Sequence, residues 1–176
     1  MIPLDKRSAR KLGKENRKNI SPKHKQKKDE LIKNECLLCA KEAQKIGCYL
    51  SFDDEVNTHE LINELLNQDK EIYVGCVDGD TLEFRRYLKT CLTKKNAFGI
   101  DEPINTESIP VSELDIIFVP LVAFDSKGNR VGYGKGYYDS ILKEAKEKIG
   151  LAYREQEVDE IEVDSWDIPL DRIIYQ

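Results

Sequence analysis

Apolar and polar residues along this chain alternate between helical and strand-like spacing, a pattern typical of layered α/β domains. Residues 4–18 and 22–46 fit two helices, separated by Ser21 and Pro22. Serine caps helix amino termini and proline suits the first helical turn, so a new helix is expected to begin here. The second helix has one apolar stripe, made of Leu31, Ile32, Cys36, Cys39, Ala40 and Ala43. Such a stripe predicts packing against a sheet.

Shorter apolar runs predict the strands of that sheet. They cover residues 46–52, 72–77, 116–119, 149–153 and 172–175, with an edge strand or hairpin arm at 82–88. Thr58 is the candidate cap of a helix predicted over 59–68, and 89–113 is expected to be mostly loop. We therefore predict a single α/β domain over residues 1–176, with three layers and a mostly parallel central sheet flanked by helices.

The most informative pattern lies between residues 115 and 142. The run 116–119 has no polar residue, which predicts a strand buried on both faces, and 125–129 has the composition of a turn. Residues 132–136 then alternate glycine with other residues, before a helix predicted over 137–147. A buried strand therefore leads, through a turn, into a glycine loop that opens into a helix.

This glycine loop has the chemistry of a phosphate site. Glycines allow a backbone to approach an anion closely, and the amino end of the following helix would direct its N–H groups and positive dipole end at the same point. Arg130 and Lys135 would add full charges. Neither a Walker A loop nor the dinucleotide fingerprint fits, because Gly136 follows Lys135 and the glycines are spaced G-x-G-x-G. A glycine-rich connection without a ligand is the alternative interpretation.

Length and composition set bounds on the class of protein. The chain has 176 residues, of which 40% are hydrophobic, enough for one well-formed core. We expect a cytoplasmic protein, because no stretch approaches ~20 apolar residues and the amino terminus lacks the apolar core of a signal peptide. The five cysteines form an odd count without a regular framework. They are expected to be buried or partly buried thiols, Cys36 and Cys39 included.

Charge is unevenly distributed along the chain. Residues 1–33 contain 12 Lys or Arg and 4 Asp or Glu, whereas the rest of the chain contains 16 and 29. Such a basic arm fits contact with nucleic acid, a solvated lysine-rich helix face, or a few cations that reach a nucleotide in an active site. The arm has no aromatic residue before Tyr49 to stack bases, which disfavours single-strand binding.

The chain offers few groups for nucleophilic catalysis. His24 and His59 are the only histidines, and neither lies beside a Ser or Cys in a nucleophile motif, so acyl-enzyme chemistry is not indicated. Asp139 directly follows the glycine loop, and Asp171 precedes the last predicted strand. Two such carboxylates suit Mg²⁺, which takes few protein ligands together with waters and substrate phosphates.

Residues 128–139, GNRVGYGKGYYD, closely resemble the signature of the 5-formyltetrahydrofolate cyclo-ligase family, whose members are also called methenyltetrahydrofolate synthetases. Further resemblances occur in the family's order through nearly the whole chain. They are Lys6 and Arg10 as Lys-x-x-x-Arg, Glu55-Val56 followed by Thr58, residues 98–103 (FGIDEP), residues 150–153 (GLAY), Trp166-Asp167 and Leu170-Asp171.

The resemblance implies an ATP- and Mg²⁺-dependent ligase of one-carbon metabolism. In that family, ATP phosphorylates the formyl oxygen of 5-formyltetrahydrofolate, and N10 of the folate then attacks the activated carbon. Ring closure expels phosphate and gives 5,10-methenyltetrahydrofolate. Both nucleophiles come from the substrate, so the protein mainly aligns two ligands and neutralises charge on the transferring phosphoryl group.

The resemblance also implies roles for individual residues. The ATP-binding set would be Lys6, Arg10, Arg130, Gly132, Gly134, Lys135, Gly136, Tyr137, Tyr138 and Trp166. The folate-binding set would be Phe52, Glu55, Asn57, Tyr133, Lys135 and Tyr137. Lys135, Arg130 and Tyr137 would act in catalysis, and Asp139 and Asp171 would bind Mg²⁺. The expected partners are therefore reduced folate and ATP, bound by a monomer without membrane or nucleic-acid contacts.

Three positions depart from the family pattern. Tyr133 stands where many members carry Arg, which removes one cation, and Asn57 occupies a position that is often acidic. Trp166-Asp167 replaces a common His-Asp pair, and Trp166 would either line the nucleotide pocket or cover the end of the sheet. Two other functions are alternatives: a non-catalytic nucleotide- or folate-binding relative, and an RNA-associated protein that uses the basic arm.

Overall fold

A seven-stranded sheet forms the centre of the molecule, in the strand order β11-β10-β7-β1-β2-β3-β6. The computed structural model describes residues 2–176. The strands are β1 Lys45–Cys48, β2 Glu71–Asp78, β3 Thr81–Tyr87, β6 Ser108–Ile109, β7 Ile116–Val119, β10 Lys148–Ala152 and β11 Arg172–Tyr175. The five strands from β11 to β2 are parallel, whereas β3 pairs antiparallel with both β2 and β6. The prediction of a mostly parallel central sheet is confirmed.

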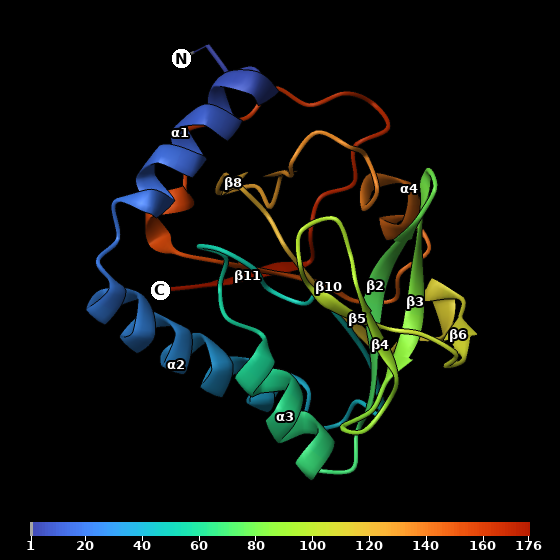
Figure 1. Ribbon diagram of the computed structural model, residues 1–176. Coiled ribbons are helices and arrows are strands. Elements are labelled where there is room, and N and C mark those ends of the chain that lie inside the picture. The colour runs from blue at the N-terminus through green and yellow to red at the C-terminus, as the bar shows by residue number, and fades with distance from the viewer. Residues whose placement is uncertain (1) are drawn as a thin grey trace.

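Helices lie on both sides of this sheet (Figure 1). The helices are α1 Lys6–Lys18, α2 Pro22–Cys39, α3 His59–Asn67 and α4 Asp139–Leu142. Apolar side chains of α2 and α3 belong to the core on one face, and Leu142 of α4 belongs to the core on the other face. The arrangement is a layered α/β fold, as the alternation of patterns predicts.

Strand β7 connects the two cores because its side chains alternate between them. Ile116 and Phe118 face the α2/α3 side, Ile117 and Val119 face the α4 side, and all four are buried. Beside it, Gly47 of β1 leaves room for the second core, since a Cβ atom there would lie 2.7 Å from Ile117 Cγ1. The predicted strand buried on both faces is confirmed.

Helix α1 packs outside the sheet, on a hairpin that follows β7. This hairpin consists of β8 Ala123–Phe124 and β9 Arg130–Val131, joined by the predicted turn. Ala9 is fully buried, and a Cβ atom on Gly13 would lie 2.2 Å from the Val122 carbonyl oxygen. Only a glycine therefore lets the helix approach the hairpin so closely.

Two predicted helices end earlier than expected. The helix expected over 22–46 ends at Cys39, because β1 begins at Lys45. The helix expected over 137–147 is confined to the four residues of α4. Glu144 and Ala145 form only short turns, and the carbonyl of Glu147 accepts a hydrogen bond from Ile117 of β7 at 2.9 Å. Sheet pairing thus overrides the local helical pattern.

Local predictions around the other elements have mixed outcomes. Ser21 caps α2 by accepting a hydrogen bond from the His24 N–H at 3.3 Å, as predicted. Thr58 is at the cap position of α3, but its hydroxyl donates to the Tyr49 carbonyl instead, so its predicted capping role is wrong. The region predicted as mostly loop, 89–113, contains β6, the 3-10 turn Val111–Glu113 and a small hairpin of β4 Thr93–Lys95 and β5 Asp101–Pro103.

Within residues 2–176, none of the helices has the length and apolar character that crossing a membrane requires. The cysteines Cys36, Cys48 and Cys76 are buried, and Cys39 and Cys91 are partly buried, all as free thiols. The predicted burial of these side chains is confirmed.

Candidate active site

A cavity of about 530 Å³ opens at the carboxyl ends of the parallel strands. Its wall includes Pro120, directly after β7, and Phe52, four residues after β1. The chain leaves β1 toward β2 on one side and leaves β7 toward β10 on the other, so the strand order reverses between β1 and β7. Open α/β sheets bind ligands at such a reversal.

The glycine loop forms one wall of this cavity. Gly134 and Gly136 have φ values of +92° and +73°, a region of backbone conformation that other residues rarely adopt. The carbonyl of Gly132 accepts a hydrogen bond from Arg10 Nε at 2.7 Å. Helix α1 therefore holds the loop directly, and Lys135 at its tip is exposed to the cavity.

Arg130 lies behind the loop, and its side chain is only 6% exposed. It donates to the Pro120 carbonyl at 2.9 Å, pairs with Asp139 at 3.4 Å, and lies over the Tyr138 ring at 5.6 Å. Burial lowers the pKa of Arg130 below its ordinary value, although the Asp139 carboxylate partly opposes this shift. Its Nε atom is buried without a hydrogen-bond partner. The side chain is thus a rigid cation at the base of the cavity.

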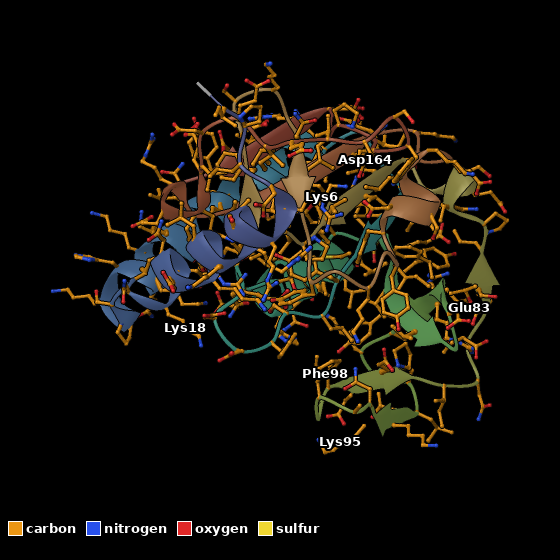
Figure 2. All side chains as sticks on the ribbon, turned by 90° about the horizontal axis from the view of Figure 1, so that it is seen from above. Lys6, Lys18, Glu83, Lys95, Phe98 and Asp164 are labelled. Atoms are coloured by element: carbon orange, nitrogen blue, oxygen red, sulfur yellow. The ribbon has the colours of Figure 1, made fainter. Side chains whose placement is uncertain are left out.

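A second cation comes from the start of α1. Lys6 Nζ lies 2.6 Å from Asp167 and 2.9 Å from Asp164, and Figure 2 shows Lys6 beside Asp164. Although partial burial opposes charge on both partners, the pairing raises the pKa of Lys6 and lowers the pKa of Asp167. Lys6, Arg10, Arg130 and Lys135 therefore bring four cations to one cavity, together with Asp139 and Asp167.

An aromatic wall faces these cations. The Phe52 and Phe98 rings stack with centroids 5.1 Å apart, and the Tyr133 ring lies 6.3 Å from Phe52. Phe98 belongs to the segment between β4 and β5 and is 68% exposed. In Figure 2, Phe98 and Lys95 lie on a lobe that extends from the body of the molecule. Flat apolar rings of this kind suit an aromatic ligand.

A buried polar network lies beneath the aromatic wall. Glu55, 6% exposed, accepts hydrogen bonds from the Phe52 N–H at 3.0 Å and the Tyr133 hydroxyl at 3.3 Å. The Tyr133 hydroxyl accepts from Arg17 at 2.9 Å, and Arg17 pairs with Asp54 at 2.8 Å. Burial raises the pKa of Glu55 to about 7, while the Phe52 N–H and Arg17 partly oppose this shift.

Most of the residues that the sequence predicts for the site line the cavity. They are Lys6, Arg10, Phe52, Arg130, Gly132, Tyr133, Gly134, Lys135, Gly136, Tyr137, Tyr138 and Asp139. Glu55 lies beneath them, bonded to Tyr133. Tyr137 and Tyr138 both line the cavity, and Tyr138 also packs against the core on the α4 side.

Three predicted site residues lie elsewhere. Asn57 accepts hydrogen bonds from the first N–H groups of α3, at 3.0 and 3.4 Å. Trp166 is 70% exposed and does not line the cavity. Asp171 lies at the amino end of the parallel strands and accepts from the Lys148 N–H at 2.8 Å, so it is at the opposite edge of the sheet from the glycine loop. Asp167 lines the cavity instead.

The helix expected to direct its dipole at the loop does not form, because α4 has four residues. Positive charge in the cavity comes from side chains rather than from a helix end. Arg17 is a further residue of this region that was not predicted from the sequence, although Lys6, Arg10, Gly13 and Arg17 follow a helical spacing that puts them on one face of α1. This helical spacing is the sequence signal that could have identified Arg17.

The fold and this cavity define an α/β protein with a ligand-sized cavity at the carboxyl edge of its parallel strands. The sequence profile of the 5-formyltetrahydrofolate cyclo-ligase family matches residues 4–176. The 5-formyltetrahydrofolate cyclo-ligase of Haemophilus influenzae is 43% identical over 143 residues, which cover 76% of each chain. The Escherichia coli K12 protein of the same name is 33% identical over 141 residues, covering 75% of this chain and 78% of that protein.

A solved structure gives the same result. The NMR structure of 5,10-methenyltetrahydrofolate synthetase from Aquifex aeolicus superposes with a TM-score of 0.85 at 33% identity, covering 97% of this chain and 89% of that chain. This chain therefore belongs to the 5-formyltetrahydrofolate cyclo-ligase family, and it is an enzyme of that family.

The raised pKa of Glu55 predicts a pH-dependent contribution to stability. The pKa is about 7 in the folded protein and 4.5 for an unperturbed carboxyl, so the folded state binds more protons between these values. The free energy of unfolding should fall as pH rises from about 4.5 to about 7, by on the order of 3 kcal/mol relative to Glu55→Gln. Urea unfolding of both proteins at pH 5, 6, 7 and 8 measures this. Parallel pH curves for the two proteins would contradict it.

Proposed function

We propose that this enzyme converts 5-formyltetrahydrofolate to 5,10-methenyltetrahydrofolate, with ATP as co-substrate and release of ADP and phosphate. The formyl oxygen takes the γ-phosphoryl group of ATP, which gives a phosphorylated formyl intermediate. N10 of the same folate then attacks the formyl carbon, and phosphate leaves as the ring closes. Membership of the family supports the overall reaction, and the cavity supports how the two substrates are held.

The observation that carries this proposal is the pairing of cations and aromatic rings in one cavity. Phosphate oxygens of ATP would lie against the glycine loop and the ammonium and guanidinium groups of Lys6, Arg10, Arg130 and Lys135. The pterin of the folate would stack on the wall formed by Phe52, Phe98 and Tyr133. The formyl group would then lie between the two walls, in reach of the γ-phosphoryl group.

Catalysis in this arrangement is mostly alignment and charge neutralisation. Lys135 lies on the exposed tip of the loop, where its positive charge can stabilise the negative charge of the phosphoryl group during transfer. Arg130 is held by the Pro120 carbonyl and by Asp139, so its charge is already positioned at the base of the cavity before phosphate binds. No histidine or cysteine is required, because the folate supplies both nucleophilic atoms.

The donor set of the cavity fits a magnesium ion. Asp139 and Asp167 both line it, and within residues 2–176 no three His, Cys, Asp or Glu side chains gather into an all-protein metal cage. Mg²⁺ binds through one or two carboxylates, waters and substrate phosphates. Asp139 and Asp167 would hold it, and Asp171 would not. The ion would supply neutralisation of phosphate charge.

A direct assay tests the reaction. The purified protein is mixed with 5-formyltetrahydrofolate, ATP and Mg²⁺, and the near-ultraviolet absorbance of the methenyl product is followed while each component is omitted in turn. We expect product only when all three are present. Folate and nucleotide binding without product would contradict the proposed activity and indicate a non-catalytic relative.

Lys135→Ala should reduce turnover by at least about 100-fold, because one preorganised cation at a phosphoryl transition state contributes several kcal/mol. The fold should be retained, since the side chain is exposed. Lys143→Ala is the matched control, as Lys143 is exposed and does not line the cavity. Turnover within threefold of the wild-type rate in Lys135→Ala would refute the role of Lys135.

Substitution of two aspartates separates the candidate metal ligands. Asp167→Asn should raise the Mg²⁺ concentration required for half-maximal activity about tenfold or more, because it removes one carboxylate from the cavity. Asp171→Asn should leave that requirement unchanged, since Asp171 binds the backbone of β10. Mg²⁺ titrations of activity measure both. An equal requirement in the two variants would exclude Asp167 as a ligand.

A further inference from the structure

The buried network under the aromatic wall contains one cation for two carboxylates. Arg17 is 5% exposed and pairs with Asp54, and the next residue, Glu55, has no cation in direct contact. Burial raises the pKa of Tyr133 to about 12, so its hydroxyl keeps its proton and donates it to Glu55. The hydrogen-bonded order is therefore Asp54, Arg17, Tyr133, Glu55, with Tyr133 as the connection between the cation and the second carboxylate.

Several other groups face Glu55 from neighbouring elements. The Phe52 N–H comes from its own turn, Tyr49 and Cys48 from the end of β1, Tyr138 from the segment before α4, and the Tyr153 hydroxyl contacts the Glu55 carbonyl. Burial raises the pKa of Tyr49, Cys48 and Tyr138 well above neutrality, so these groups are uncharged. Arg17 is consequently the cation that favours the ionised form of Glu55.

Each carboxylate oxygen of Glu55 has one partner and can accept a second. Tyr133 also has its ring in the cavity, where it is 40% exposed and lies near Phe52. The hydroxyl that Arg17 holds at 2.9 Å therefore fixes both the ring and the carboxylate beneath it. Adjacent N–H donors on a flat heterocycle are the natural partners of such a carboxylate.

Resting on the proposed function, we propose that Arg17 is a positioning residue of the folate subsite. Through the Tyr133 hydroxyl it holds Glu55 as the acceptor for the N–H donors of the pterin ring. Arg17 does not line the cavity, so it would contact neither substrate, whereas Glu55 lies directly beneath the cavity-lining Tyr133 and is 6% exposed. Its effect is transmitted to the folate and not to the nucleotide, whose phosphates face the glycine loop.

The test is a comparison of Michaelis constants across pH. Arg17→Gln should raise the KM for 5-formyltetrahydrofolate roughly tenfold, because Glu55, the acceptor for the pterin N–H groups, is no longer held in place through the Tyr133 hydroxyl. The KM for ATP should change less than twofold. The acid limb of kcat/KM for the folate should move up by about one pH unit, since removal of a nearby cation raises the pKa of a carboxyl. Arg17→Lys retains the charge, so its acid limb should remain at the wild-type pH.

Further variants distinguish positioning from a structural role. Tyr133→Phe should raise the folate KM, and combining it with Arg17→Gln should add little further, because both changes break one chain of contacts. Arg7→Gln, on the exposed face of α1, is the matched control. Equal increases in both KM values without a pH shift, or fully additive single effects, would overturn the proposal. If Arg17→Gln does not fold, Tyr133→Phe provides the comparison of the two KM values, and Arg17→Lys remains the variant expected to keep the wild-type acid limb.

Measurements on the wild-type protein and these variants distinguish failure of the Arg17 proposal from failure of the proposed cyclo-ligase reaction. Wild-type protein without turnover would refute the cyclo-ligase activity. The Arg17 proposal would then be decided by calorimetric affinities for 5-formyltetrahydrofolate at pH 6 and pH 8. Affinity that is unchanged in Arg17→Gln at both pH values would overturn it.

Discussion

The active-site cavity depends on the close contact between α1 and the hairpin that follows β7. Gly13 allows this contact, since any Cβ atom would collide with the Val122 carbonyl, and Arg10 then reaches the Gly132 carbonyl from the same helix. Because α1 also carries Lys6 and Arg17, one packing interaction delivers cations to the rim of the cavity and to its floor. Two cations of the basic arm, Lys6 and Arg10, thus line the cavity, and a third, Arg17, lies beneath it.

The two halves of the cavity differ in how they hold charge. On the side of the glycine loop, four cations line the cavity, so they suit a ligand with several negative charges. On the aromatic side, a single cation is buried beneath Tyr133 and serves two carboxylates. Each buried charge there interacts more strongly with neighbouring groups, because water screens it less. The sheet edge therefore offers two electrostatic environments within one cavity.

Local sequence signals predicted the elements whose stability is local. The strand β7 and the Ser21 cap are examples, since an apolar run and a capping serine act on their own neighbours. The helix expected over 137–147 was wrong because Glu147 pairs with β7, a contact between distant parts of the chain. The residue pattern identified the glycine loop and the resemblance supplied Lys6, but the sequence indicated Asp171 as a metal ligand, whereas Asp167 lines the cavity. Only three residues lie between them, and strand pairing decides which one reaches the cavity.

The ion pairs within the cavity have a consequence for selectivity. Arg130 is paired with Asp139, and Lys6 is paired with Asp167, so much of the positive charge already has a counterion supplied by the chain. A simple anion must compete with these internal carboxylates. When phosphate binds together with a divalent cation, the phosphate can pair with Arg130 and Lys6, and the cation can pair with Asp139 and Asp167. Every charge of the two ion pairs then keeps a partner of opposite sign. Internal pairing of this kind adds an electrostatic cost to the binding of a simple anion at Lys6 and Arg130, without any steric barrier.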